Sequence, residues 1–313
     1  APAGTVLTPA HLGVLAGQGY AEVTVCRPLT VGILSTGSEL LEPGAPWAPG
    51  KIYDANGIQN AARLRQLGFA DVAEVAIGAD LCTIDEAKDF MEEVPAKIPF
   101  MGTSCCPAWS VMAKKLFPQQ AECISMAMTP MVLTARLIKK EKPNARICFI
   151  GPCAAKKLEA SRRSVRSEVD FVLTFEELMG LFEAKAVNFA DLPDNPEDAF
   201  NSASADARGF AASGGVAQAV VNAIKKMDPD REVKVMSAQG LADCKKMMMM
   251  AKAGKYNGYL LEGMACPGGC IAGAGTLADP AKSVAMLNKY KNEAAMKVAT
   301  ETPYQDSLDL LHY

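Results

Sequence analysis

Hydrophobic and polar positions along the chain alternate between short apolar runs and longer segments with helical spacing. Ile98–Met101 and Arg146–Ile150 are apolar runs of the length of buried strands. Thr83–Glu93 and Phe175–Ala184 instead place apolar residues three and four apart, which predicts amphipathic helices. The same pattern predicts further strands at Asp71–Ile77, Asp170–Leu173, Glu232–Met236 and Tyr256–Glu262, and further helices ending at Leu116 and at Lys226.

This alternation of strands and helices predicts an α/β fold with mainly parallel sheets flanked by helices. In such sheets, ligands bind where strands end at their carboxyl edge. Three cysteine-containing segments directly follow predicted strands, so we expect them to converge. They are Gly102-Thr-Ser-Cys-Cys-Pro, Gly151-Pro-Cys153 and Met264-Ala-Cys-Pro-Gly-Gly-Cys.

Composition narrows the class of protein. The 313 residues are 50% hydrophobic and 21% charged, with a net charge of −3, so nothing indicates a nucleic acid or an anionic membrane as partner. No apolar run reaches the ~18–20 residues that span a bilayer. No signal peptide is evident either, and we therefore expect a cytoplasmic protein.

Ten cysteines and only two histidines favour metal binding through sulfur. A disulfide framework is the alternative, but such frameworks belong to small secreted domains. Here Cys105 and Cys106 are adjacent, and Cys266 and Cys270 are four apart, an arrangement that suits soft-metal ligation.

The three segments together offer five thiols, whereas a cubane iron–sulfur cluster takes four. Adjacent side chains in an extended turn point in different directions, so we expect one of Cys105 and Cys106 to be a ligand and the other to be a spare thiol. The neighbouring residues Pro107, Pro152 and Gly268 suit a backbone that approaches an inorganic cofactor closely.

The segments Thr103-Ser-Cys-Cys-Pro-Ala-Trp109, Pro152-Cys-Ala-Ala-Lys-Lys-Leu-Glu159 and Glu262-Gly-Met-Ala-Cys-Pro-Gly-Gly-Cys270 resemble, in order, the three signatures of the FeFe (iron-only) hydrogenase catalytic domain. The resemblance runs over residues 58–313. It implies two lobes with the metal cluster between them, and reversible conversion of dihydrogen into protons and electrons.

The resemblance also implies roles for individual residues. A 4Fe-4S cluster would be joined to a 2Fe subcluster carrying CO, CN and azadithiolate, together called the H-cluster. Cys105 would relay protons, and Lys156 would hydrogen-bond a cyanide. Met131 and Met264 would line the diiron pocket, with Ser104 and Pro107 beside it. The cubane ligands would be Cys106, Cys153, Cys266 and Cys270, the last also bridging to the diiron part.

In the family, protons pass from the relay cysteine through a glutamate, a serine and a second glutamate. Glu159 and Ser125 match the first two positions, and Asp89 stands where the outer glutamate is expected, with Glu86 near it. For Glu86 and Asp89 the alternative is a solvated acidic helix face.

Residues 1–57 resemble a different family. Leu7-Thr-Pro-Ala-His-Leu-Gly-Val-Leu-Ala and Ile33-Leu-Ser-Thr-Gly-Ser-Glu-Leu-Leu-Glu-Pro-Gly44 resemble a molybdopterin molybdotransferase (MoeA-like). The fragment is too short for a whole pterin site, so we expect it to complete the sheet or cap of the hydrogenase domain.

Three other functions stay open: a low-turnover hydrogen sensor, a non-catalytic hydrogenase-like iron–sulfur assembly scaffold, and a molybdenum-cofactor insertion module. A scaffold needs neither Cys105 nor Lys156, so both residues favour the enzyme. For the enzyme, the implied partners are a ferredoxin or similar electron carrier and the hydrogenase maturation proteins.

Overall fold

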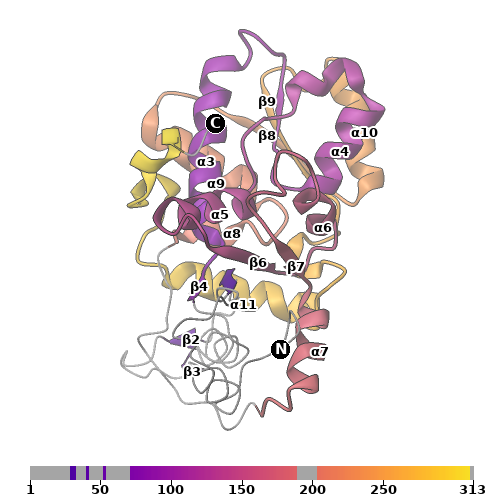
Figure 1. Cartoon of the computed structure of the whole chain (residues 1–313). Coiled ribbons are helices and arrows are strands. Elements are labelled where there is room, and N and C mark those ends of the chain that lie inside the picture. The colour runs from indigo at the N-terminus through magenta and orange to yellow at the C-terminus, as the bar shows by residue number, and fades with distance from the viewer. Residues whose placement is uncertain (1–28, 33–39, 42–51, 54–70, 189–202, 311–313) are drawn as a thin grey trace, which may run out of the picture.

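Two parallel sheets flanked by helices make up the fold, which confirms the predicted α/β class (Figure 1). The computed structural model describes residues 29–32, 40–41, 52–53, 71–188 and 203–310. A small pair of strands, β2 (Leu40–Leu41) and β3 (Ile52–Tyr53), accompanies the two larger sheets. None of the helices in these ranges is long and apolar enough to cross a membrane.

The first sheet has the strand order β4-β1-β6-β7, and all its pairs are parallel. Side chains alternate along β6: Ile147 packs against helix α5, whereas Cys148 and Ile150 pack against helix α7. The elements are β1 (Leu29–Gly32), β4 (Asp71–Ala73), β6 (Arg146–Ile150), β7 (Phe171–Leu173), α5 (Pro130–Glu141) and α7 (Phe175–Ala184).

The second sheet has the order β5-β9-β8, again parallel. Leu260 of its central strand packs against helices α3 and α9, and Leu261 packs on the other face against α4 and α10. The elements are β5 (Met101–Gly102), β8 (Lys234–Gln239), β9 (Tyr259–Met264), α3 (Ala76–Glu93), α4 (Pro107–Leu116), α9 (Gly215–Met227) and α10 (Leu241–Lys252).

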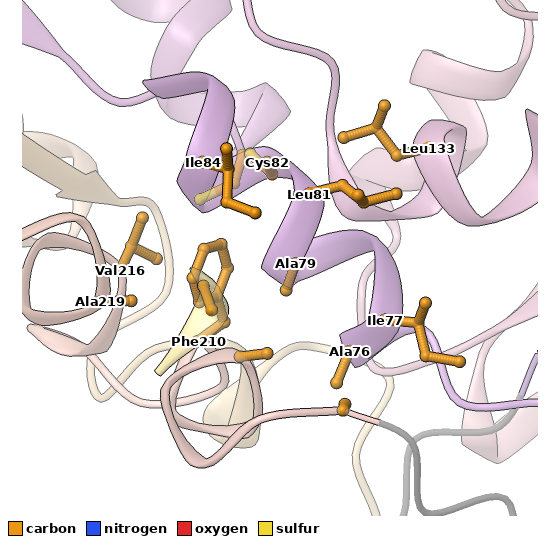
Figure 2. Packing of buried hydrophobic residues seen from close by; sticks show 14 of the residues in the cluster. Ala76, Ile77, Ala79, Leu81, Cys82, Ile84, Leu133, Phe210, Val216 and Ala219 are labelled. Atoms are coloured by element: carbon orange, nitrogen blue, oxygen red, sulfur yellow. The ribbon is translucent and has the colours of Figure 1, made fainter. Parts of the chain in front are cut away.

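Helix α3 packs against helices of both sheets and so connects the two sheets. Figure 2 shows Leu81 facing Leu133 of α5 on one side, while Phe210 and Val216 lie on another. The strand expected over Asp71–Ile77 is wrong at its end, because β4 stops at Ala73 and α3 begins at Ala76. The first turns of α3 are buried all round, so their apolar run resembles that of a strand.

Shorter elements complete the described part of the chain. Helix α8 (Ala205–Gly209) packs against α11 (Pro280–Glu293) and α9. The others are α6 (Ala155–Ala160), η1 (Pro118–Cys123), η4 (Cys270–Ala272), η5 (Ala299–Glu301) and η6 (Gln305–Leu310).

The segment that resembles a molybdotransferase contributes strand β1 to the first sheet. Its Leu29–Gly32 pairs with β4 on one side and with β6 on the other. The boundary expected between residues 57 and 58 lies outside the described residues and stays a prediction.

A buried polar network joins α3 to the segment before α8. Asp80 accepts hydrogen bonds from the backbone N–H of Ser204 (2.9 Å) and from its hydroxyl. Nearby, Arg208 forms an ion pair with Glu74 (3.1 Å), and Tyr290 also donates to Glu74 (3.0 Å). Burial raises the pKa of Asp80 to about 7, against the opposing hydrogen bonds from Ser204.

We expect Asp80→Asn to change how stability depends on pH. Because the pKa of Asp80 is raised in the folded state, the folded wild type binds its proton more tightly than the unfolded chain. Wild-type stability should therefore fall as pH rises from about 4 to about 7. Between pH 5 and pH 8 the variant should gain on the order of 2 kcal/mol relative to wild type, measured by denaturant unfolding. The exposed Asp230→Asn is the control, and an equal gain there would contradict the assignment.

Candidate metal centre

The first cysteine segment is a turn between β5 and α4. Cys106 caps α4 with extended backbone (φ −92°, ψ 104°), and Pro107 occupies the first position of the helix, where no backbone donor is needed. Trp109 returns along the turn and donates from Nε1 to the carbonyl of Thr103 (3.0 Å). The helix start on one side and the hydrogen bond from Trp109 to Thr103 on the other therefore hold the turn that carries Cys105 and Cys106.

The second segment leaves β6 at Ile150 and carries Cys153 into α6. The carbonyl of Pro152 accepts a hydrogen bond from the backbone N–H of Gly275 (3.0 Å), which ties this segment to the chain just beyond the third. Backbone N–H of Lys156 donates to the carbonyl of Cys153 (3.2 Å), so the first turn of α6 fixes both residues together.

The third segment leaves β9 and makes a tight turn from Cys266 to Cys270. Gly269 has φ +96°, a conformation that other residues rarely adopt. A Cβ at Gly269 would lie 2.6 Å from the backbone N of Ser213. The carboxylate of Glu262, on β9, accepts from the backbone N–H groups of Gly214 (2.6 Å) and Ala217 (2.8 Å), which anchors the strand to the start of α9.

The three segments meet at one cavity, which has roughly 710 Å³ of empty space, part of it open to solvent. Its wall is mostly apolar and includes Lys156, Met131 and Met264. The thiols on the wall are those of Cys105, Cys106, Cys153 and Cys270. The cysteines therefore converge between the carboxyl ends of two sheets, and not at one edge of a single sheet.

Cys266 lies outside that lining but within electrostatic range of Cys153 and Cys106. Burial raises the pKa of the thiols of Cys153, Cys266 and Cys270, that of Cys270 to about 12. Backbone N–H of Ala265 donates to Sγ of Cys106 (3.5 Å). A cationic cluster would offset the cost of ionising buried thiols, and N–H donors to sulfur are a common feature of iron–sulfur sites.

The ligands of a cluster are arranged differently from those of a single metal ion. Within the described ranges, no three His, Cys, Asp or Glu side chains converge closely enough to hold one metal ion. In a cubane each thiolate binds a different iron, so its ligands stand farther apart than those of a tetrahedral zinc site. Four thiolates are the usual ligands of a cubane, so the chemistry of the donor set fits an iron–sulfur cluster.

Lys156 is a buried cation beside the cavity. Its Nζ forms an ion pair with Oε2 of Glu159 (2.7 Å) and donates to the carbonyl of Cys105 (3.3 Å). Burial lowers the pKa of Lys156, but the charge and hydrogen bond of Glu159, together with the nearby thiols of Cys153 and Cys105, raise that pKa above its usual value. The other oxygen of Glu159 accepts from the hydroxyl of Thr129 (2.6 Å). Both oxygens of Glu159 are thus engaged.

Glu86 occupies the opposite side of the Cys105 turn. It is fully buried, so the solvated helix face considered for it is wrong. Its Oε1 accepts from the backbone N–H (2.7 Å) and the hydroxyl (3.0 Å) of Ser104, whereas its buried Oε2 has no hydrogen-bond partner among the described residues. Burial raises the pKa of Glu86 to about 7. Burial, followed by the charge of Glu86, raises the pKa of the Cys105 thiol well above its usual value.

The remaining predicted site residues do not line the cavity. Ser125 accepts from the backbone N–H of Ala127 (3.1 Å), and Asp89 is half-buried one turn beyond Glu86 on α3. Ser104, Pro107 and Ser125 line a second pocket that does not include the cysteines.

Two contacts of the site were not predicted from the sequence. The contact between Glu86 and Ser104 joins residues 18 apart that share no motif. Thr129 precedes a proline at the start of α5, which is a helix-capping signal, but nothing in the sequence indicates that it holds Glu159. The scattered cysteines behaved as expected: Cys82, Cys123, Cys148 and Cys244 are buried, and Cys26 lies outside the described residues.

The parallel sheets and the thiol-lined cavity at their strand ends make this an α/β protein with a candidate iron–sulfur site. Residues 51–274 match the family model for the iron only hydrogenase large subunit, C-terminal domain, and the chain belongs to this family. Iron–sulfur cluster binding is a property of that family.

Individual relatives agree with this membership. The NADP-reducing hydrogenase subunit HndD of Solidesulfovibrio fructosivorans is 30% identical over 262 residues, which are 69% of this chain and 44% of HndD. The chain thus spans less than half of that relative. The FeFe-hydrogenase structure HydA(deltaEFG) superposes with a TM-score of 0.68 at 23% identity, covering 91% of this chain and 90% of HydA, and it supports the fold.

Two further similarities concern the alternative functions, a molybdenum-cofactor insertion module and an iron–sulfur assembly scaffold. Molybdopterin molybdenumtransferase 2 of Mycobacterium tuberculosis is 46% identical over 78 residues, or 25% of this chain and 19% of that protein. The cytosolic Fe-S cluster assembly factor NAR1 of Scheffersomyces stipitis is 29% identical over 156 residues, or 45% of this chain and 28% of NAR1.

We expect Gly269→Ala to destabilise the turn from Cys266 to Cys270. Its Cβ would meet backbone atoms of Ser213 and Ala211, and its φ is strained for alanine. The matched control is Gly258→Ala, which has a similar φ (+81°) but open space around the new Cβ. Denaturant unfolding should show a loss at least about 2 kcal/mol larger for Gly269→Ala than for the control. Equal losses would mean that the close approach contributes nothing.

Proposed function

We propose that this chain is the catalytic domain of an FeFe hydrogenase, which interconverts dihydrogen with protons and electrons. The observation that carries the proposal is the position of Cys105. This spare thiol shares one cavity with three of the candidate ligands and with the buried ammonium of Lys156. An iron–sulfur site that only stabilises the fold requires neither the Cys105 thiol nor the Lys156 ammonium.

Four residues would hold the cofactor. Cys106, Cys153 and Cys266 would bind the 4Fe-4S cluster, and Cys270 would bind it and bridge to the diiron part. When bound, the H-cluster supplies the diiron site at which dihydrogen is cleaved and the cubane that accepts electrons. Met131 and Met264 lie on the apolar wall and would exclude water from the diiron side.

Lys156 would orient the cofactor by donating to an anionic cyanide ligand. A buried ammonium needs an anionic partner, and charge-assisted hydrogen bonds are stronger than neutral ones. Glu159 supplies one such partner in the ligand-free chain and keeps Lys156 charged. Glu159 therefore supports a positioning role for Lys156.

Cys105 would accept and donate the proton at its Sγ. Glu86 is the carboxyl group that supports the next step, because one of its oxygens lacks a hydrogen-bond partner in the described residues and its pKa is about 7. A group with that pKa gains and loses protons readily near neutrality. Ser104 holds the Glu86 carboxylate through its other oxygen. Ser125 and Asp89 are proposed for the outer part of the route.

A second candidate function is a non-catalytic iron–sulfur assembly scaffold, which the similarity to NAR1 favours. A low-turnover hydrogen sensor would use the same residues as the enzyme. The short match to a molybdenumtransferase supports a structural role for residues 1–57 more than cofactor insertion, since β1 pairs within the first sheet.

Partners follow from the chemistry. A buried cluster must exchange electrons with a carrier, and we propose a ferredoxin or a similar protein; the name of HndD supports an electron-transfer chain. A diiron part with cyanide and carbonyl ligands must be delivered, so we propose hydrogenase maturation proteins as further partners. The description of HydA(deltaEFG) as revealing stepwise H-cluster assembly supports this.

The function is tested by loading the chain anaerobically with iron, sulfide and a synthetic diiron cofactor. We expect about four iron atoms per chain before the diiron step. Infrared bands of cyanide and carbonyl should follow that step, together with dihydrogen production from reduced viologen. Cys105→Ala should retain the iron and the bands but lose at least about a hundredfold in turnover.

The buried Cys123→Ala serves as the thiol control and should keep full turnover. Retention of iron without any cyanide or carbonyl bands would favour the assembly scaffold. Full turnover in Cys105→Ala would reject the relay role and leave the ligand set intact.

Two substitutions distinguish the proposed roles of the buried carboxylates: Glu86→Gln and Glu159→Gln. Glu86→Gln keeps the shape but cannot carry a proton, so turnover should fall by at least about a hundredfold with the infrared bands unchanged. Glu159→Gln removes the anion that pairs with Lys156, so the cyanide bands or the extent of loading should change. The opposite result, with Glu159→Gln silencing turnover under unchanged bands, would make Glu159 the carboxylate next to Cys105.

A further inference from the structure

A second pocket lies on the far side of the Lys156–Glu159 ion pair. It has about 1040 Å³ of empty space, part of it open to solvent, between helices α4 and α5 and the chain around α6. Its lining is far more polar than that of the cysteine cavity. The hydroxyls are those of Ser104, Ser110, Ser125, Thr129 and Ser164, and the cations are Lys114, Arg136 and Arg162.

The charges around this pocket do not balance. Arg136 lies 3.6 Å from Glu168, and both oxygens of Glu159 are engaged by Thr129 and Lys156. Lys114 and Arg162 form no ion pair with a carboxylate in the described part of the chain. Two positive charges are therefore left facing one polar space.

Lys114 shows the consequence of this imbalance. It is half-buried, and among the described residues its Nζ donates to Sδ of Met126 (3.2 Å), which carries no charge. Burial, and after it the nearby charge of Arg162, lowers the pKa of Lys114. Two like charges held together in a hollow are stabilised by an anion that binds between them.

We propose that this pocket binds a phosphate group, either as inorganic phosphate or as a phosphate ester. An ammonium, a guanidinium and several hydroxyls match the charge and the acceptor oxygens of a dianion. A carboxylate, with one charge, would neutralise only half of the excess. The proposal does not rest on the hydrogenase function, because none of the candidate cluster ligands lines this pocket, although Ser125 and Glu159 of the proposed site lie on its wall.

The pocket is linked to the cysteine cavity by a short chain of contacts. Thr129, on the wall of the pocket, donates to Glu159 (2.6 Å), and Glu159 pairs with Lys156 (2.7 Å). Lys156 in turn donates to the carbonyl of Cys105 (3.3 Å). A phosphate bound there would stand one ion pair away from the candidate metal centre.

The test measures phosphate binding to the full chain, purified anaerobically, by calorimetry and by thermal unfolding. Inorganic phosphate is compared with chloride and acetate at equal ionic strength, and AMP serves as the probe for an ester. Lys114→Gln and Arg162→Gln are the pocket variants. Lys115→Gln and Arg163→Gln are the matched controls, because these neighbours are exposed and do not line the pocket.

We expect phosphate to raise the melting temperature of the wild type and of both controls, and each pocket variant to weaken phosphate binding at least about tenfold. In chloride, Lys114→Gln should melt no lower than wild type, because it removes a like-charge contact. Tighter binding of AMP than of phosphate would identify an ester as the ligand, and the reverse would identify the free anion. An equal effect of acetate or chloride, or an equal loss in the controls, would overturn the proposal.

Discussion

Four thiols from three distant segments must be held at one point between two sheets, and the rest of the structure serves that constraint. Each segment begins where a parallel strand ends, so the strands fix the starting points. Only two of the segments share a sheet, however, and Cys153 belongs to the other. The distance between the sheets therefore decides whether the thiols converge at all.

Helix α3 sets that distance. It leaves β4 of the first sheet, packs against α5 along its first half and against α9 of the second sheet along its last half. The first half of α3 is buried on all sides, which explains why its first turns have no solvent-exposed polar face. The same helix brings Glu86 to the Cys105 turn, so the element that joins the two halves also supplies the buried carboxyl group.

The sequence predicts the strands that lead into the cysteine turns, because a strand followed by a Gly/Pro-rich turn is a local pattern, whereas β4 ends before its predicted end and β8 ends after it. β6 and α7 have the predicted bounds, and the cysteine turns lie where expected. Contacts between segments could not be predicted in the same way. The pairing of Ser104 with Glu86, and that of Thr129 with Glu159, depend on how helices cross, and no local pattern encodes those crossings.

The two buried carboxylates, Glu86 and Glu159, differ because only Glu159 forms an ion pair with a cation in the described part of the chain. Glu159 forms a buried ion pair with the ammonium of Lys156, so removing either side chain would leave the other charge uncompensated. Glu86 forms no ion pair with a cation in the described part of the chain, and its burial favours the protonated form against the hydrogen bonds from Ser104. The first arrangement fixes a charge beside the cysteine cavity, whereas the second leaves a carboxyl group that can change its protonation state at little cost. Glu86 contacts the Cys105 turn directly and Glu159 contacts it through Lys156, so the different roles proposed for these two glutamates come from their surroundings and not from their residue type.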